Sequence, residues 1–327
     1  MDTGRRLTDK ELEQVEKRIA KEYKQAEKEM RKKLKKQTAD FGVKDKAKAE
    51  LLKQGKLSES DYLNWREAQL KRSAWMKNLI DDYVSEQVKA NKRASAIING
   101  SLADVYAENR NFATYEIEKE LAVDTSFKLY SKKSVRDLQI GTQINVAKDR
   151  AWHNRKIQSA LTQGIVQGES IDKISERLLR IGIMDENAAM RNARTMVGAA
   201  ESKARLDSYL EASEKGIKMK KTWIATLDDR VRDSHAELDG ETVELNEKFS
   251  NGLMYPRDPN GDPAEVYNCR CDMIAQIAGF ERDVTDLDIR PAKIGSYEEW
   301  KTAHTKATLK RRLRQAIKRV LDKYYKR

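Results

Sequence analysis

Apolar side chains recur along the first forty residues with the spacing of a helix. Thr8 and Glu11 form a capping-box pattern typical of a helix start, and the positions after them follow steps of three and four residues. The sequence therefore predicts a charged helical rod over residues 1–56 with one narrow apolar stripe, which needs another helix of this chain or another subunit to cover it. The stripe consists of Leu12, Val15, Ile19, Tyr23, Ala26, Met30 and Leu34.

A second helical region is expected over residues 57–150. The run from Ser58 to Asp61 is a helix-start signature, and Asn99-Gly100 is a candidate stop. Between them, apolar residues at four-residue steps form a second stripe, and further helical patterns cover 101–122 and 133–163. The second stripe consists of Met76, Ile80, Val84 and Val88.

Residues 151–215 continue the helical pattern as the first part of a domain predicted over 151–280. Gly164 and Gly168 indicate a break, after which we expect a short helix and then another from about 185 to 214.

The pattern changes at Gly216. Lys220 to Thr226 has strand propensity, Asp228 is placed to cap a short helix that carries His235, and a turn and a second strand-like run follow. After a loop rich in Pro, Gly and Asn, residues 266–277 alternate, with Cys269 and Cys271 on the same face. Residues 216–280 are therefore predicted to form a compact α+β module.

Composition supports a chain that is mainly α-helical with this one small α+β module. Charged residues make up 36% and aromatic residues only 7%, which suits long solvated helices with thin buried stripes. No proline occurs before Pro256, so the first 255 residues contain no residue that reliably breaks a helix. No apolar run approaches the roughly 20 residues of a membrane span, and the N-terminus has no signal-peptide pattern, so neither a membrane anchor nor export is expected.

The positive charge is concentrated at the C-terminal end of the chain. Residues 301–327 hold eleven Lys and Arg against Asp322, which is +10 of the total +12. The sequence predicts a polar connector and then a basic amphipathic helix over residues 281–327. Such a helix favours contact with the phosphates of double-stranded DNA. The alternatives are a solvated terminal helix, a calmodulin-binding type of peptide and a membrane-surface peptide. The candidate DNA contacts are Lys310, Arg311, Arg312, Arg314, Lys318, Arg319 and Lys323.

The most specific local chemistry is His235 with Cys269 and Cys271. Imidazole and thiolate are preferred zinc ligands, so these three residues are candidate ligands of a structural zinc ion, with no obvious fourth ligand beyond the nearby Asp228, Asp233 and Asp239. The alternative is that both thiols fill the inward face of a strand beside Met273 and Ile277. Two cysteines at positions i and i+2 are poorly placed for a disulfide, which favours a reducing compartment.

Signatures of enzymes are sparse. The chain lacks phosphate-binding, nucleophile-elbow and His-Glu-x-x-His motifs, and the likeness of His235-Ala-Glu237 to zinc deaminases fails at the Pro-Cys-x-x-Cys half. We therefore expect no enzymatic activity. A metal-dependent hydrolase or nuclease built on His235, Cys269 and Cys271 remains the rival hypothesis.

Several of these residues together resemble the phage Mu F-like head morphogenesis family, the minor head proteins of tailed phages. The resemblance lies in the run from Trp223 to His235, in Leu238-Asp-Gly240 and in Asn268-Cys-Arg-Cys271, with weaker helical matches upstream, and it covers about 155–277. By residue match, the motif positions are Trp223, Asp228, Arg230, His235, Gly240, Asn268, Cys269, Arg270 and Cys271.

The resemblance implies a role in assembling the phage head. It implies association with the portal protein and with capsid or scaffolding proteins, a location in the host cytoplasm during assembly and then inside the virion head, and, in some relatives, ejection with the genome. A host-directed effector delivered with the genome is a further alternative.

Overall fold

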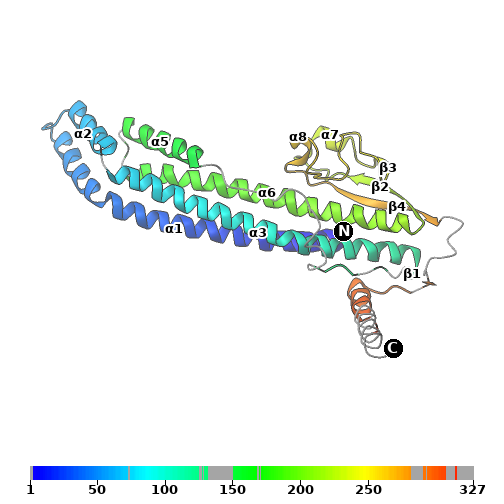
Figure 1. The fold of residues 1–327 in the computed structure, drawn as a ribbon. Coiled ribbons are helices and arrows are strands. Elements are labelled where there is room, and N and C mark those ends of the chain that lie inside the picture. The colour runs from blue at the N-terminus through cyan, green and yellow to red at the C-terminus, as the bar shows by residue number, and fades with distance from the viewer. Residues whose placement is uncertain are drawn as a thin grey trace, which may run out of the picture. The chain divides into compact units, whose positions relative to one another are not determined.

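The computed structural model describes residues 3–72, 74–124, 127, 129–131, 150–167, 169, 171–280, 290–291, 293–306 and 314. Helices dominate it, and a three-stranded antiparallel sheet with two short helices forms a compact module (Figure 1). The predicted fold class, mainly α with a small α+β module, is confirmed. The long helices are α1 (Thr3–Lys53), α2 (Glu59–Arg72), α3 (Ala74–Leu121), α5 (Arg150–Val166) and α6 (Ile171–Glu214).

The chain divides into two compact units, and α1, α3 and α6 each contribute residues to both. One unit, which we call the helical unit, comprises residues 14–99 and 143–193. The other, which we call the mixed unit, comprises residues 1–13, 100–142 and 194–327 and holds the sheet. The domain limits expected at residues 56, 150 and 280 stay predictions.

The apolar stripe of α1 is buried within the helical unit. Met30 and Leu34 pack with Tyr83 and Val84 of α3 and with residues of α5 and α6. Val15 and Ile19 are fully buried as well. The stripe predicted from its spacing is therefore confirmed, and for Met30 and Leu34 the covering helices belong to the same chain.

Helix starts follow the predicted capping pattern at α2 but not at α1. Ser58 Oγ accepts a hydrogen bond from the Asp61 amide at 3.0 Å, as expected of a capping box. Helix α1, in contrast, already begins at Thr3, so the predicted start at Thr8 is wrong. Thr8 is buried inside the helix, and its hydroxyl accepts a hydrogen bond from Asn109 Nδ2 at 2.9 Å.

Two predicted helix ends are absent because packing outweighs local propensity. Helix α3 passes through Asn99-Gly100 and continues to Leu121. A glycine inside a helix costs only about 1 kcal/mol, and Ile98 and Leu102 are buried on either side of it. Helix α6 runs unbroken from Ile171 to Glu214, where two helices were expected. The helical pattern expected over 133–149 lies outside the described residues.

The sheet of the mixed unit has the order β3-β2-β4. Strand β2 (Ile217–Ile224) lies in the centre and pairs antiparallel with β3 (Thr242–Glu244) and with β4 (Asp272–Phe280). Side chains of β2 alternate between buried and exposed, as a half-buried strand requires. The alternation predicted over 266–277 is present, but the strand itself begins only at Asp272, so both cysteines lie just before it.

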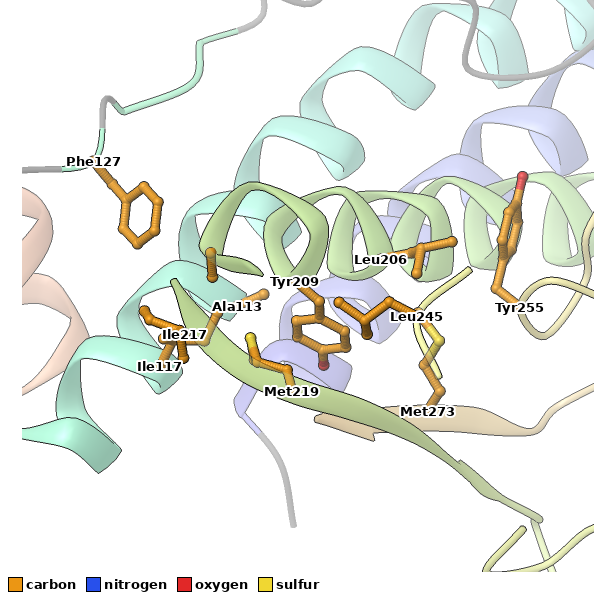
Figure 2. Packing of buried hydrophobic residues seen from close by; sticks show 11 residues of the cluster. Ala113, Ile117, Phe127, Leu206, Tyr209, Ile217, Met219, Leu245, Tyr255 and Met273 are labelled. Carbon is orange, nitrogen blue, oxygen red and sulfur yellow. The ribbon is translucent and has the colours of Figure 1, made fainter. Parts of the chain in front are cut away.

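One face of the sheet packs on the C-terminal part of α6. Figure 2 shows Met219 of β2 beside Tyr209 of the helix, and Ile217 of β2 beside Ile117 of α3. Met273 of β4, Leu206 of α6 and Ala113 of α3 belong to the same buried cluster, together with Phe127, Ala212, Leu245 and Tyr255. The apolar cluster fixes the sheet on the helices and thereby positions the loops that carry the His/Cys motif.

A short helical segment near the C-terminal end docks through aromatic rings. Tyr297 packs edge-on against Phe112 of α3 with a centroid distance of 5.1 Å, and Trp300 packs against Tyr115 at 5.9 Å. Just before it, β5 (Arg290–Pro291) pairs antiparallel with β1 (Val123–Asp124). Within the described residues, no helix combines the length with the apolar character that a membrane span requires.

Candidate functional site

His235 lies in the interior of the α+β module and is held from both sides. It is carried by the short helix α7 (Asp233–Ala236) and is 1% exposed. Its Nε2 lies 2.8 Å from Oε2 of Glu265 on helix α8 (Pro263–Val266), and its Nδ1 lies 3.4 Å from Sγ of Cys271. The edge of the imidazole packs against the Trp223 ring at a centroid distance of 5.4 Å.

Both cysteines turn toward the same point. Cys269 is 4% exposed and Cys271 is 2% exposed. Their sulfur atoms and a ring nitrogen of His235 all lie within 4.8 Å of one another. The structure therefore brings together the three residues that the sequence indicated as candidate metal ligands.

The environment of the two thiols differs. A hydrogen bond between the sulfur atoms lowers the pKa of Cys271, and a hydrogen bond from His235 lowers it further. The same sulfur–sulfur hydrogen bond raises the pKa of Cys269, and burial adds to the rise. The pair therefore favours a thiolate at Cys271, the sulfur next to the imidazole.

Asp228 does not cap a helix, in contrast to the prediction. Helix α7 begins at Asp233, and its N-cap residue, Arg232, makes no side-chain capping bond. Asp228 instead forms a two-pronged ion pair with Arg270 and accepts a hydrogen bond from the Arg230 amide at 3.0 Å. The Arg270 guanidinium, followed by the Arg230 amide, holds the pKa of Asp228 well below its usual range.

Other motif positions shape the backbone. Gly240 has φ +81°, and its amide donates to the Trp223 carbonyl at 2.9 Å, so this turn requires a residue that tolerates the left-handed region. Asn268 has φ +59° directly before Cys269. Trp223 is fully buried in the small core that includes Phe249 and Leu253.

None of the suggested fourth ligands joins the cluster in the described geometry. Asp228 is paired with Arg270, and Asp239 accepts a hydrogen bond from the Ala225 amide at 2.9 Å. Asp233 is exposed. The carboxylate nearest to His235 in the hydrogen-bond network is Glu265, which sequence reasoning missed.

Sequence reasoning missed Glu265 and one further residue around the cysteines, Arg257. Glu265 belongs to α8, and the start of this helix at Asp262-Pro263 is recognisable from the sequence. Asp262 accepts a hydrogen bond from the Ala264 amide, and proline occupies the first turn. Arg257 is 5% exposed, and its Nη2 donates to the Cys271 carbonyl at 2.9 Å. Its burial has no local sequence signal.

A second group with metal-ligand chemistry lies elsewhere in the mixed unit. Glu118, Asp124 and His304 bring their ligand atoms within 4.8 Å of one another, beside a cavity of about 430 Å³. Glu118 already accepts a hydrogen bond from Trp300 Nε1 at 2.5 Å and lies 3.6 Å from His304 Nε2. The buried carboxylate of Glu118 therefore already contacts Trp300 and His304 in this group.

The candidate DNA contacts of the tail fall almost entirely outside the described residues. Arg314 is described, in a helical and exposed position. The other six, Lys310, Arg311, Arg312, Lys318, Arg319 and Lys323, lie outside the described residues, so contact with DNA stays a prediction.

Comparison with known proteins supports the resemblance seen in the motif. Residues 155–274 match the family described as Phage Mu protein F like protein, a segment that contains every motif position. The chain is also 24% identical over 262 residues to minor head protein GP7 of Bacillus phage SPP1, covering 76% of this chain and 82% of GP7. The similarity to the phage Mu F-like head morphogenesis family is thereby confirmed.

Other relatives are much longer than the matched region. The chain is 31% identical over 150 residues to NAD(+)–arginine ADP-ribosyltransferase EFV of Enterococcus faecalis, covering 45% of this chain and 31% of that protein. It is 28% identical over 211 residues to an uncharacterized protein of Haemophilus influenzae, covering 62% of this chain and 44% of that protein. The chain thus spans less than half the length of these two relatives. No solved structure matches it.

Proposed function

Because residues 155–274 match the phage Mu F-like family, we propose that this protein is a phage minor head protein that acts in head morphogenesis. It associates with portal, capsid or scaffolding proteins in the host cytoplasm and is incorporated into the head interior, near the packaged DNA. The observation that carries the proposal is the match to a minor head protein along 76% of the chain, because it extends well beyond the His/Cys module.

Co-expression with the portal and major capsid proteins of the same phage tests the assembly role. We expect the chain to sediment with assembled heads or portal rings and to be protected there from added protease. A chain that stays at the top of the gradient, apart from the assembled heads, would contradict the proposal. So would a phage that lacks the gene for this protein and still forms complete, fully infectious heads.

We further propose that the basic tail contacts double-stranded DNA. Ten net positive charges in residues 301–327 exceed what solubility needs, and each neutralised phosphate adds affinity that depends on salt. A variant in which the seven basic residues from Lys310 to Lys323 become Gln should lose affinity for DNA. The slope of log K against log salt should become less negative by about 0.9 for every phosphate that is no longer neutralised.

A charge-matched variant controls for a general loss of positive charge. Seven basic residues on the exposed face of α1 offer the same change in net charge: Arg18, Lys21, Lys24, Lys28, Lys32, Lys35 and Lys36. The tail proposal requires DNA affinity to fall much more in the tail variant than in this control. Equal decreases would mean that the net charge, not the tail, attracts DNA.

We infer a structural rather than an enzymatic role for the module. His235, Cys269 and Cys271 are each at most 4% exposed, so a substrate has no direct access to them. The named activity of the Enterococcus relative belongs to a protein of which this chain covers 31%. Incubation with labelled NAD(+) and arginine-containing acceptors, and separately with DNA and divalent metal ions, should give no product. Turnover that disappears in His235→Gln would instead support the hydrolase or nuclease alternative.

A further inference from the structure

Three atoms of the types that zinc prefers converge inside the α+β module. We propose that the module binds one zinc ion through Nδ1 of His235 and the sulfur atoms of Cys269 and Cys271, with a non-protein fourth ligand such as water. Tetrahedral zinc with bonds of about 2.3 Å to sulfur and about 2.0 Å to nitrogen places the nitrogen about 3.5 Å from a sulfur. The observed separation of Nδ1 from the Cys271 sulfur is 3.4 Å.

Glu265 sets the orientation that a metal-binding imidazole needs. A carboxylate can only accept, so Nε2 of His235 carries the proton that faces Oε2 of Glu265 at 2.8 Å. A metal ion binds the neutral imidazole, and in that form the lone pair is on Nδ1, the nitrogen that faces the sulfur atoms. Any proton that Nδ1 shares with the Cys271 sulfur leaves when the metal binds. A carboxylate behind the imidazole is the usual outer partner of a histidine that binds zinc. Glu265 is thus a positioning residue and not a ligand.

The segment from Tyr267 to Cys271 is held in place by side chains of other elements rather than by strand pairing. The Tyr267 carbonyl accepts a bond from Arg232, and the Asn268 amide donates to Thr195 Oγ1. Further along, Thr226 donates to the Arg270 carbonyl at 2.7 Å, and Arg257 donates to the Cys271 carbonyl at 2.9 Å.

This framework fixes where both sulfur atoms point before any ion arrives. Asn268 adopts a left-handed conformation, φ +59°, directly before the first cysteine. Such a conformation persists where the surrounding contacts hold it in place. A ligand set whose backbone is already fixed loses little conformational entropy on binding.

The module also has the character of a fold that gains from a metal. Its core of buried residues around Trp223 is small, and its regular elements away from the sheet are two helices of four residues each. Small units with little regular structure are often held together by a metal or by disulfides. Here the ion would link α7 to the segment just before β4. This inference does not depend on the proposed role in head assembly.

Metal analysis of the full-length chain tests the site. The chain is purified with zinc in the medium and dialysed without chelator. We expect one zinc per chain by elemental analysis, and none in the Cys269→Ser/Cys271→Ser double variant. Cobalt(II) exchanged into the wild-type chain should show sulfur-to-metal charge-transfer absorption and the strong visible bands of a tetrahedral site. Removal of zinc by a chelator should lower the melting temperature, and its return should restore it.

Two further variants separate binding from a general effect on folding. Glu265→Gln should keep the stoichiometry at saturating zinc but bind it about 10- to 100-fold more weakly, because only the outer partner of His235 changes. His304→Gln alters the other metal-ligand group, Glu118–Asp124–His304, and should keep both zinc content and affinity.

Two results would overturn the proposal: a wild-type chain that retains no zinc, or cobalt spectra without sulfur charge transfer. The three side chains would then be joined in the core by hydrogen bonds to sulfur alone. Zinc that is retained by the double variant but absent from His304→Gln would place the ion in the other group and overturn it as well.

Discussion

Nε2 of His153 lies 2.7 Å from Oδ2 of Asp185, and neither side chain is exposed to solvent. His153 belongs to α5 and Asp185 to α6, so this pair ties two helices of the helical unit together. Asn91 of α3 adds a longer hydrogen bond, with Nδ2 at 3.4 Å from the same carboxylate oxygen. The helical unit therefore contains a buried polar network that spans three helices.

Removing His153 should destabilise the helical unit strongly. In His153→Ala, the Asp185 carboxylate stays buried and loses its closest partner, which typically costs about 3 kcal/mol. Denaturant unfolding followed by circular dichroism measures the change. Gln158→Ala, at an exposed position of the same helix, is the control and should change the unfolding free energy by less than about 0.5 kcal/mol. Equal effects of the two variants would show that the pair contributes nothing specific.

Two glycines inside long helices should respond to alanine with opposite signs. A Cβ atom at Gly198 of α6 would lie 2.1 Å from Nη1 of Arg257, a buried side chain that is bonded to the Cys271 carbonyl. Gly198→Ala should therefore destabilise the chain by about 2 kcal/mol. At Gly100 of α3 a Cβ would meet nothing within 4 Å, so Gly100→Ala should stabilise by up to about 1 kcal/mol. Thermal unfolding of both variants checks the contrast, and stabilisation by both would contradict the close approach.

Lys221 should make stability depend on pH in the alkaline range. Its side chain is fully buried, its Nζ donates to the carbonyls of Leu245 and Met254, and burial lowers its pKa from 10.5 to about 8. Between pH 8 and 10.5 the unfolded chain holds one proton more than the folded chain, so the unfolding free energy should rise with pH. The gain is at most about 3 kcal/mol.

The Lys221→Met variant isolates this effect. Its unfolding free energy, measured over the same pH range, should lack the rise that Lys221 produces. The unfolding free energy of the wild type minus that of the variant should therefore increase with pH. If the unfolding free energies of the two proteins differ by the same amount from about pH 7 to the pKa of an unfolded lysine, the pKa of Lys221 is not lowered in the folded chain.

Trp300 should matter through its indole nitrogen as well as its ring. Nε1 donates to Glu118, a fully buried carboxylate. Trp300→Phe keeps an aromatic ring but takes this donor away, so we expect a destabilisation of about 2 kcal/mol. Tyr297→Phe is the matched control, because its partner Glu108 keeps an ion pair with Lys301 at 2.6 Å. Hydrogen exchange of residues 297–306 should accelerate in the first variant and change little in the second.

Much of the candidate site was predictable from residue types and spacing. The convergence of His235 with Cys269 and Cys271 was expected, because alternation places both thiols on one face and the intervening elements are short. The orientation of the imidazole was not, because Glu265 lies 30 residues further along the chain. Likewise, Asp228 looked like a helix cap by its position, but the structure gives it Arg270 as a partner.

The sequence by itself determined the features whose signal is periodic: the stripe of α1 and the alternation over residues 266–277, which places the two thiols on the same face. It also determined the concentration of positive charge in residues 301–327. Periodicity carries this information because each residue's face follows from helix or strand geometry alone.

Only the tertiary structure decided where helices end and which buried polar groups pair. Gly100 lies within a helix because buried neighbours outweigh its propensity, and Thr8 lies within α1 because Asn109 and burial accommodate it. These outcomes depend on interactions between residues far apart in the chain. The free energy of such interactions exceeds the fraction of a kcal/mol by which local preferences differ.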